Sequence, residues 1–305
     1  MSSSNTISAG TPVAAYAALT TAAIVWGGSV VAQKVALGPF SPVEVSVFRG
    51  LGALLMLIPL WIWREGLEAC SLRDVGVFAL LGVAVLANHL LMLFGLQYIG
   101  AGAAGIIIGA SPTITAFLSS IIIHDHPFRQ VWVGCAVSFV GVLFVSGMNG
   151  SAHVGGNPLL GGGAVLLSLV SWALYTIGSR QVMKRFSSLM VNWTTLLSSI
   201  VLQIPLLFLN QQVLASGIDV VPFSGWMALF YVVVFATALG QQAWLYGVEG
   251  VGPSRAGIFV NLIPVSALFL SFFILGESIG WGDVLGIGFI LLGVWLVNRQ
   301  SSRHA

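Results

Sequence analysis

The sequence predicts an all-helical integral membrane protein, in which ten transmembrane helices form two inverted five-helix repeats around a central cavity. Composition is the first observation: 57% of the 305 residues are hydrophobic, and only 11 are basic and 9 acidic. Soluble domains carry charge on about a quarter of their residues. Long apolar runs and an internal repeat are the second and third observations.

Each apolar run is about 20 residues long, enough to cross the hydrocarbon core of a bilayer as a helix. The runs are continuous and contain scattered glycine and proline, unlike the alternating strands of an outer-membrane barrel. We place the ten spans at residues 12–36, 41–63, 74–96, 102–123, 129–148, 157–183, 187–209, 222–246, 253–275 and 281–299.

The chain repeats itself. Residues 95–145, shifted by 152, align without a gap on residues 247–297, and 14 of the 51 positions are identical. A shift of 146 places Trp26 on Trp172 and Lys34 on Arg180. The predicted repeats are therefore residues 12–148 and 157–299, joined by a glycine-rich linker. Because five is odd, the second half begins on the opposite side of the membrane, an inversion that many transporters share.

Basic residues collect at one end of the predicted helices. Nine of the eleven lie on the side of the N-terminus, while Lys34 lies near the far end of the first span and Arg49 within the second. The positive-inside rule therefore puts both termini in the cytoplasm. Residues 1–11 contain no lysine or arginine, so they do not resemble a signal peptide.

The sequence excludes several other classes of function. It contains no Gly-rich phosphate loop, catalytic triad or zinc motif, and no long hydrophilic segment with room for a catalytic domain. Cys70 and Cys135 suggest neither a disulfide framework nor a metal site. The run His124-Asp125-His126 is better explained as a solvated loop than as a metal site. We expect no cofactor, no metal and no nucleic-acid partner.

Two prolines occupy corresponding positions in the repeats. Pro112 and Pro264 lie near the middle of the fourth and ninth spans. A proline leaves the carbonyl four residues earlier without its helical partner, here Ile108 and Val260. At membrane depth such carbonyls must meet a polar group or a cavity. We expect two kinked helices with substrate-facing carbonyls, against the alternative of harmless kinks. The matching glycines, Gly105 and Gly257, allow a neighbouring helix to approach closely.

Polar and aromatic side chains also lie deep in the spans. Intramembrane polar groups usually face a bundle interior or a wet cavity, and membrane tryptophans usually collect at the interfaces. Interhelical hydrogen bonds and core packing are the simpler explanations for any one of these residues, but their occurrence in both repeats favours a shared pocket. We expect a substrate-binding set of Trp26, Asn88, His89, Met92, Trp172, Tyr175, Gln241, Trp244 and Asn261.

Two charged residues belong to the second span. Glu44 lies in its first turn, where a carboxylate suits the helix dipole, and it is a candidate partner for Lys34. Arg49 lies deeper. It could hold a substrate carboxylate through parallel hydrogen bonds, or it could join helices through backbone carbonyls, and we favour the second role.

These features resemble a known family. Ten helices, inverted five-helix halves and the Gly…Gly…Pro pattern that opens each last helix pair are similar to the EamA branch of the drug/metabolite transporter superfamily. Within that branch the chain most resembles the YddG-type aromatic amino acid exporters, through Trp26, the Asn88-His89 pair and Trp172. The resemblance implies export of an amino acid from a bacterial cytoplasm.

We therefore expect a transporter in the bacterial inner membrane, not an enzyme, which exports aromatic or other neutral amino acids by alternating access. All nine acidic residues lie at span ends or in loops, which favours facilitated transport. Alternatives are exporters of other small metabolites or drugs of the same superfamily, and less so an integral-membrane enzyme. A phosphorylated-sugar carrier would need more buried cations than Arg49. Monomers and oligomers are both compatible with the sequence.

Overall fold

The computed structural model describes residues 12–64, 71–122, 129–148, 157–208, 217–251, 256 and 258–301, and this part of the chain is helical without a strand. Seven of its helices are long and apolar enough to cross a membrane. Three shorter apolar helices occupy the remaining predicted spans. The prediction of an all-helical membrane protein with ten spans is confirmed.

The first repeat supplies six helices, because its fourth span is divided in two. They are α1 (Pro12–Ala36), α2 (Pro42–Arg64), α3 (Leu72–Tyr98), α4 (Ala101–Ile108), α5 (Ser111–Ile122) and α6 (Arg129–Met148).

The second repeat is more irregular, since π-helical and 3-10 segments interrupt two of its spans. Its elements are α7 (Pro158–Val182), α8 (Ser188–Leu207), η1 (Ile218–Val220), α10 (Phe223–Tyr231), η2 (Val232–Gly240), α11 (Gln241–Val251), η3 (Ile258–Asn261), α13 (Leu262–Leu270), η4 (Ser271–Leu275) and α14 (Trp281–Ser301).

Helix starts follow from polar side chains that accept hydrogen bonds from free N–H groups of the first turn. Ser71 and Asp74 form a reciprocal capping box at α3. Glu44 accepts hydrogen bonds from the backbone N–H and the hydroxyl of Ser41, both at 2.9 Å. Ser187 caps α8 at the position that matches Ser41 in the repeat. Glu44 thus serves the start of its own helix.

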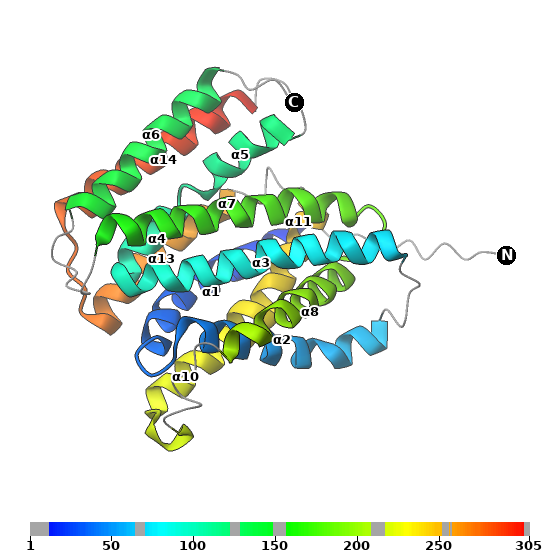
Figure 1. Ribbon diagram of the computed structural model, residues 1–305. Helices are drawn as coiled ribbons and strands as arrows, with labels where there is room; N and C mark the ends of the chain where they lie inside the picture. Colours follow the sequence, from blue (N-terminus) through cyan, green and yellow to red (C-terminus); the bar gives the residue numbers. More distant parts are fainter. Residues whose placement is uncertain are drawn as a thin grey trace.

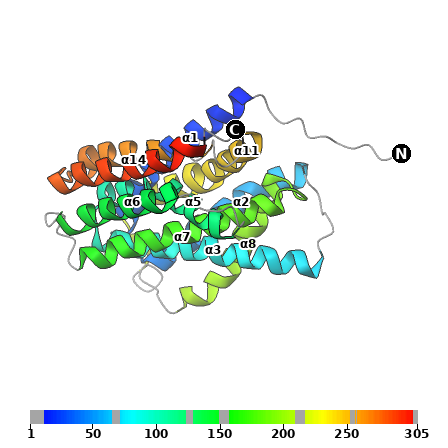
Figure 2. The same cartoon turned by 90° about the horizontal axis from the view of Figure 1, so that it is seen from above.

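The two repeats pack against each other through several pairs of helices. Helices of the first repeat pack against helices of the second: α6 on α14, α3 on α7, α2 on α8, and α4 on α13. Figures 1 and 2 show α6 beside α14 from two directions. A Cβ added at Gly141 would lie 2.7 Å from the carbonyl oxygen of Gly286, and one at Gly293 would lie 2.5 Å from that of Gly134. Glycine therefore allows these two backbones to touch.

At both predicted proline kinks the α-helical winding is interrupted, although each span continues as one helix, Ala101–Ile122 and Phe259–Leu275. α4 ends at Ile108 and α5 begins at Ser111, so Pro112 lies in a first turn, where no N–H is needed. Pro264 likewise follows the 3-10 segment η3 in the first turn of α13. The helices are thus irregular at the two prolines, as expected, and the irregular turn precedes each proline because a first turn accepts proline without an N–H.

One end of the molecule is fastened by two charged side chains. We call it the outer end, because the charge distribution predicts that it faces away from the cytoplasm. Lys34 donates hydrogen bonds to the carbonyl oxygens of Leu96 and Ile99 at the end of α3. The Glu277 carboxylate accepts hydrogen bonds from the N–H groups of Ala101 and Gly102 at the start of α4, both at 2.8 Å.

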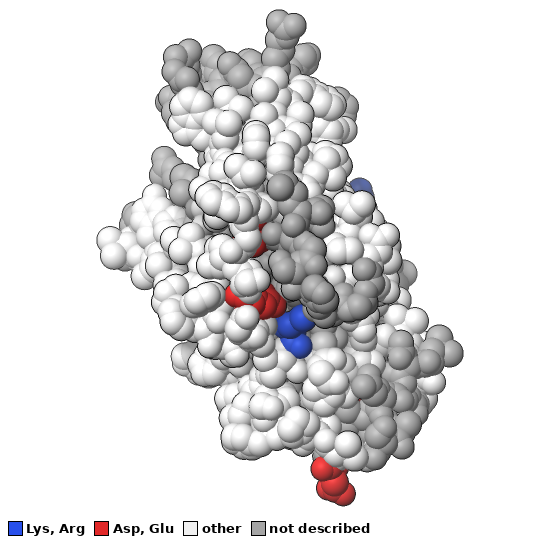
Figure 3. Space-filling model, turned by 90° about the vertical axis from the view of Figure 1, so that its left-hand side faces the viewer, with Lys and Arg blue, Asp and Glu red and all other residues white. Residues whose placement is uncertain are grey.

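Both ends of the α3–α4 turn are therefore held by complementary charge. In Figure 3, which faces this end, acidic and basic atoms meet near the centre of a largely uncharged surface. The partnership of Lys34 with Glu44, offered by the sequence, is replaced by these backbone contacts, because the end of α3 comes within reach of Lys34.

Candidate functional site

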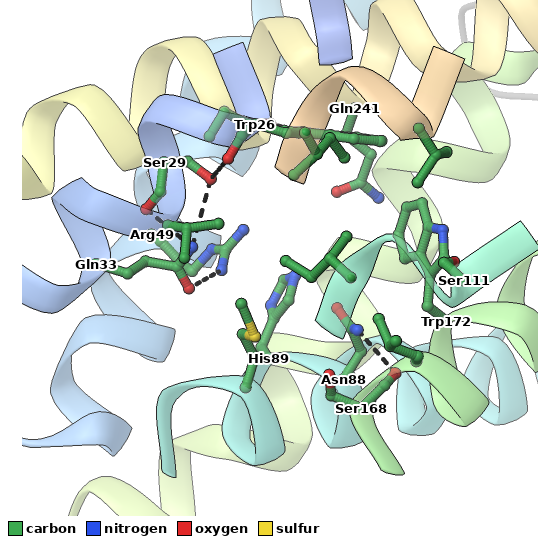
Figure 4. A pocket seen from close by; sticks show the side chains of 17 residues that line it. Trp26, Ser29, Gln33, Arg49, Asn88, His89, Ser111, Ser168, Trp172 and Gln241 are labelled. Carbon is green, nitrogen blue, oxygen red and sulfur yellow. Dashed lines mark hydrogen bonds between the residues drawn. The ribbon is translucent and has the colours of Figure 1, made fainter. Parts of the chain in front are cut away.

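A cavity lies between the two repeats, with an empty volume of about 730 Å³ that is partly open to its surroundings. Among the described residues that line it, Arg49 carries the one formal charge. The lining consists of Trp26, Ser29, Val30, Gln33, Arg49, Asn88, His89, Met92, Ile108, Ser111, Ser168, Leu169, Trp172, Ala236, Gln241, Val260 and Ile263. Figure 4 shows the labelled side chains projecting from several helices toward one space.

Tryptophans from both repeats form one wall. The Trp26 and Trp172 rings meet edge to face, with centroids 5.5 Å apart and planes at 88°. Trp244 packs against Trp26 from behind at 5.2 Å, and Tyr175 packs against Trp172 at 5.3 Å. The indole N–H of Trp26 donates to the carbonyl oxygen of Ala236 at 3.0 Å. The wall is therefore fixed in position by ring contacts and by this bond.

The opposite side of the cavity is polar and centred on Arg49, whose residue surface is 8% exposed. Its Nε donates to the hydroxyl of Thr237 at 3.1 Å, and its Nη1 donates to Oε1 of Gln33 at 3.2 Å. Gln33 is held in turn by the carbonyl oxygen of Ser29, at 3.1 Å from Nε2. Arg49 joins its helix to α1 and η2, as expected, but through side-chain oxygens instead of backbone carbonyls.

The third polar group comes from α3. Asn88 Nδ2 donates to the carbonyl oxygen of Ser168 at 2.9 Å, which leaves its amide oxygen toward the cavity (Figure 4). His89 is 4% exposed, and its Nδ1 has no hydrogen-bond partner among the described residues. Gln241 Nε2 donates to the Tyr175 hydroxyl at 3.3 Å.

Broken helices supply much of the remaining lining. Ile108 and Ser111 flank the α4–α5 break, while Val260 and Ile263 flank the junction of η3 and α13. The two residues whose carbonyls the prolines were expected to free, Ile108 and Val260, thus border the cavity. The π-helical winding of η2 brings Ala236 to the same space, and π-helical turns recur at functional sites.

The structure brings together six of the nine residues expected to bind substrate: Trp26, Asn88, His89, Met92, Trp172 and Gln241. Tyr175 and Trp244 stand behind the wall as supports. Asn261 is outside the lining, and its buried Oδ1 lacks a partner among the described residues.

The remaining predicted positions either lie in helix contacts or fall outside the described residues. A Cβ at Gly105 would lie 2.3 Å from that of Ala267, so this glycine allows α4 and α13 to touch. Gly257 and the run His124-Asp125-His126 lie outside the described residues. In the described part, no three histidine, cysteine or acidic side chains are grouped to hold a metal ion.

Sequence reasoning missed several lining residues, above all Ser29, Gln33, Ser111 and Ser168. A helical spacing of three or four residues could have found three of them. Ser29 and Gln33 follow Trp26 on one face of α1, and Ser168 precedes Trp172 by four residues on α7. Neutral polar side chains of this kind are common in membrane helix contacts, which is why they drew no notice.

Comparison with known proteins identifies the family. The chain matches the EamA-like transporter family twice, over residues 13–147 and 159–299. It is 30% identical over 266 residues to "Uncharacterized transporter YyaM" of Bacillus subtilis, covering 86% of each chain. It is 24% identical over 284 residues to "Uncharacterized inner membrane transporter YedA" of Escherichia coli K12, covering 92% of this chain and 90% of that one.

A solved structure superposes with a TM-score of 0.65 at 16% identity and covers 95% of this chain and 98% of its own, which supports the fold. With two matching repeats, ten helical spans and a cavity between them, the chain belongs to the EamA-like transporter family and is a multi-pass membrane transporter.

Proposed function

We propose that this transporter exports aromatic or other neutral amino acids across the bacterial cytoplasmic membrane by alternating access, with both termini in the cytoplasm. One observation carries the proposal: the cavity combines tryptophan rings with polar side chains and a single cation, Arg49, which lies across from Trp172. An aromatic or aliphatic side chain suits the wall, and the charged backbone groups of an amino acid suit the polar side. The resemblance of Trp26, Asn88-His89 and Trp172 to YddG-type exporters supports the same substrate class.

The polar side offers partners of both signs to such a solute. Arg49 is a buried cation, and the amide oxygen of Asn88 faces the cavity as an acceptor for an ammonium group. The described lining contains no carboxylate to serve as a proton carrier. We therefore include facilitated transport, driven by the gradient of the substrate, in the proposal.

Transport by purified protein in liposomes tests this function. A panel of labelled amino acids should show counterflow with aromatic and large neutral members ahead of glycine, and the rate should survive an uncoupler that collapses any proton gradient. Exchange without net downhill flux would indicate an antiporter. Uphill flux driven by an imposed pH gradient would contradict facilitated transport. Movement of lipophilic amines alone would replace amino acids with drugs as the substrate class.

A further inference from the structure

We propose that Arg49 and His89 form a carboxylate subsite, which fixes the substrate class as small solutes that carry one carboxylate. The inference rests on the proposed function and deepens it. Its basis is an imbalance of charge: the described lining holds one cation and no anion. A buried cation within a membrane is costly unless something pairs with it.

The arginine is oriented before any ligand arrives. Nε and Nη1 are held by Thr237 and Gln33, which come from different repeats. The Thr237 hydroxyl donates to the carbonyl oxygen of Val232 at 2.8 Å, so its oxygen is turned toward Arg49 as an acceptor. Nη2 makes no hydrogen bond with a described residue. A guanidinium carries five N–H donors, so with one donor of Nε and one of Nη1 engaged, three remain to meet a carboxylate.

His89 supplies the second and independent observation. Its ring lines the same cavity, is 4% exposed, and has an unpartnered Nδ1. Figure 4 shows the imidazole and the guanidinium directed toward the same part of the cavity. A neutral imidazole carries one N–H, which it can donate to a carboxylate in the cavity. A carboxylate has enough lone pairs to accept hydrogen bonds from both groups.

The uncharged partners of Arg49 argue against a purely structural ion pair. Gln33 and Thr237 orient the cation but leave its charge uncompensated. Trp172 lies across the cavity from Arg49 in Figure 4, so its ring offers apolar surface to the rest of the solute. The subsite therefore selects for a carboxylate at one end, while the wall tolerates different side chains at the other.

The test uses four ligands with the same phenyl ring: L-phenylalanine, 3-phenylpropionate, L-phenylalaninamide and phenethylamine. Their binding to the purified full-length protein is measured by quenching of tryptophan fluorescence. Each ligand with a carboxylate should bind about 10- to 100-fold more tightly than its counterpart without one, the range of a charge-assisted hydrogen bond. Arg49→Gln should reduce that ratio to below about threefold, and Arg49→Lys should give an intermediate value, because lysine keeps the charge and loses the planar fork.

Arg185→Gln is the matched control, because it removes an arginine whose side chain is 68% exposed and far from the lining, where it pairs with Asp74. The affinity ratio between ligands with and without a carboxylate should be the same in Arg185→Gln as in the parental protein. If Arg49→Gln fails to fold, His89→Leu decides, with an expected fall of about fivefold or more in the same ratio.

The outcomes separate the two proposals. Equal binding of acid and amide by the parental protein, or a parental ratio in Arg49→Gln, overturns the carboxylate subsite even when amino acids are transported. Failure of both carboxylates to bind overturns it as well. Arg49-dependent binding of 3-phenylpropionate without amino acid transport leaves the subsite standing and refutes the proposed function.

Discussion

Trp172 has two structural partners that decide how far its ring reaches into the cavity. Trp26 meets it edge to face, and Tyr175 packs against it one turn further along α7. Tyr175 is itself fully buried and bound to Gln241, so the support behind Trp172 is rigid. At the scale of the residue, the tryptophan rings are fixed by their contacts, and under the proposed function their shape would decide which substrate side chains fit.

Trp172→Ala should change substrate preference while the protein stays folded. Loss of the ring enlarges the cavity, so the advantage of large over small side chains in transport should fall about tenfold, which is ~1.4 kcal/mol. Competition between labelled phenylalanine and alanine in liposomes measures the ratio. Trp281→Ala, at a position that is 78% exposed, is the control and should behave as the parent. Aggregation of Trp172→Ala would assign the ring to core packing instead, with a cost of about 3–5 kcal/mol.

The elements that depart from regular α-helix add to a site whose lining comes mostly from the regular helices α1, α2, α3 and α7. The spans could be predicted from sequence because length and hydrophobicity decide them. Pro112 and Pro264 indicated where the helices would be irregular. Whether a helix breaks or bends at such a proline depends on the turns next to it. No pattern in the sequence indicated the π-helical winding of η2, whose Thr237 contacts Arg49 of the other repeat. Site residues could therefore be predicted from sequence where a polar side chain is unusual in the middle of a membrane span, as His89 is.

Pro112→Ala and Pro264→Ala should each lower transport and leave folding intact. Alanine restores an N–H and favours continuous helix across the break, which draws Ile108 or Val260 away from the cavity. Initial rates in liposomes, together with thermal stability of the purified variants, check this. Pro205→Ala is the control, because Pro205 lies inside α8 and outside the lining. Parental rates in both test variants would show that the breaks have no part in transport.

Glu277→Gln should loosen the outer end. The amide holds the first turn of α4 less strongly than a carboxylate does, by ~1–2 kcal/mol, so the outer end should open about 5- to 30-fold more often. The readout is labelling of Ala103→Cys by a membrane-impermeant maleimide, in a background with Cys70 and Cys135 replaced by serine. Glu249→Gln, at an exposed position on α11, controls for loss of an acid. A labelling rate within twofold of the parent would refute the fastening role.

At the scale of the whole molecule, the two inverted repeats must take up their orientation in the membrane together. Helix pairs that join the two repeats, such as α6 with α14, make the halves one interlocked body, so neither half can be oriented independently. The basic residues at the predicted span ends then orient both halves together.

A reporter fused after Ala305 should be cytoplasmic, and one inserted after Gly150 should be periplasmic. The reason is the concentration of lysine and arginine at the end where α1 begins. An insertion after Lys184, between α7 and α8, is the control and should report the cytoplasm. Alkaline phosphatase and a fluorescent protein, which are active on opposite sides, give complementary readings. A cytoplasmic signal at Gly150 would contradict inverted repeats.

The fastening of the outer end has a kinetic consequence. A carrier that is open to one side for a small fraction of the time binds solute there with an apparent dissociation constant raised by the inverse of that fraction. Lys34 and Glu277 hold the outer end, whereas Arg180, the repeat counterpart of Lys34, is exposed at the opposite end. The external substrate concentration that gives half-maximal influx should therefore be higher than the internal concentration that gives half-maximal efflux. Under the facilitated transport that we propose, the carrier cannot displace the substrate equilibrium, so the maximal influx rate must be larger in the same proportion. The two directions would then differ in their half-saturating concentrations and still reach the same final substrate distribution.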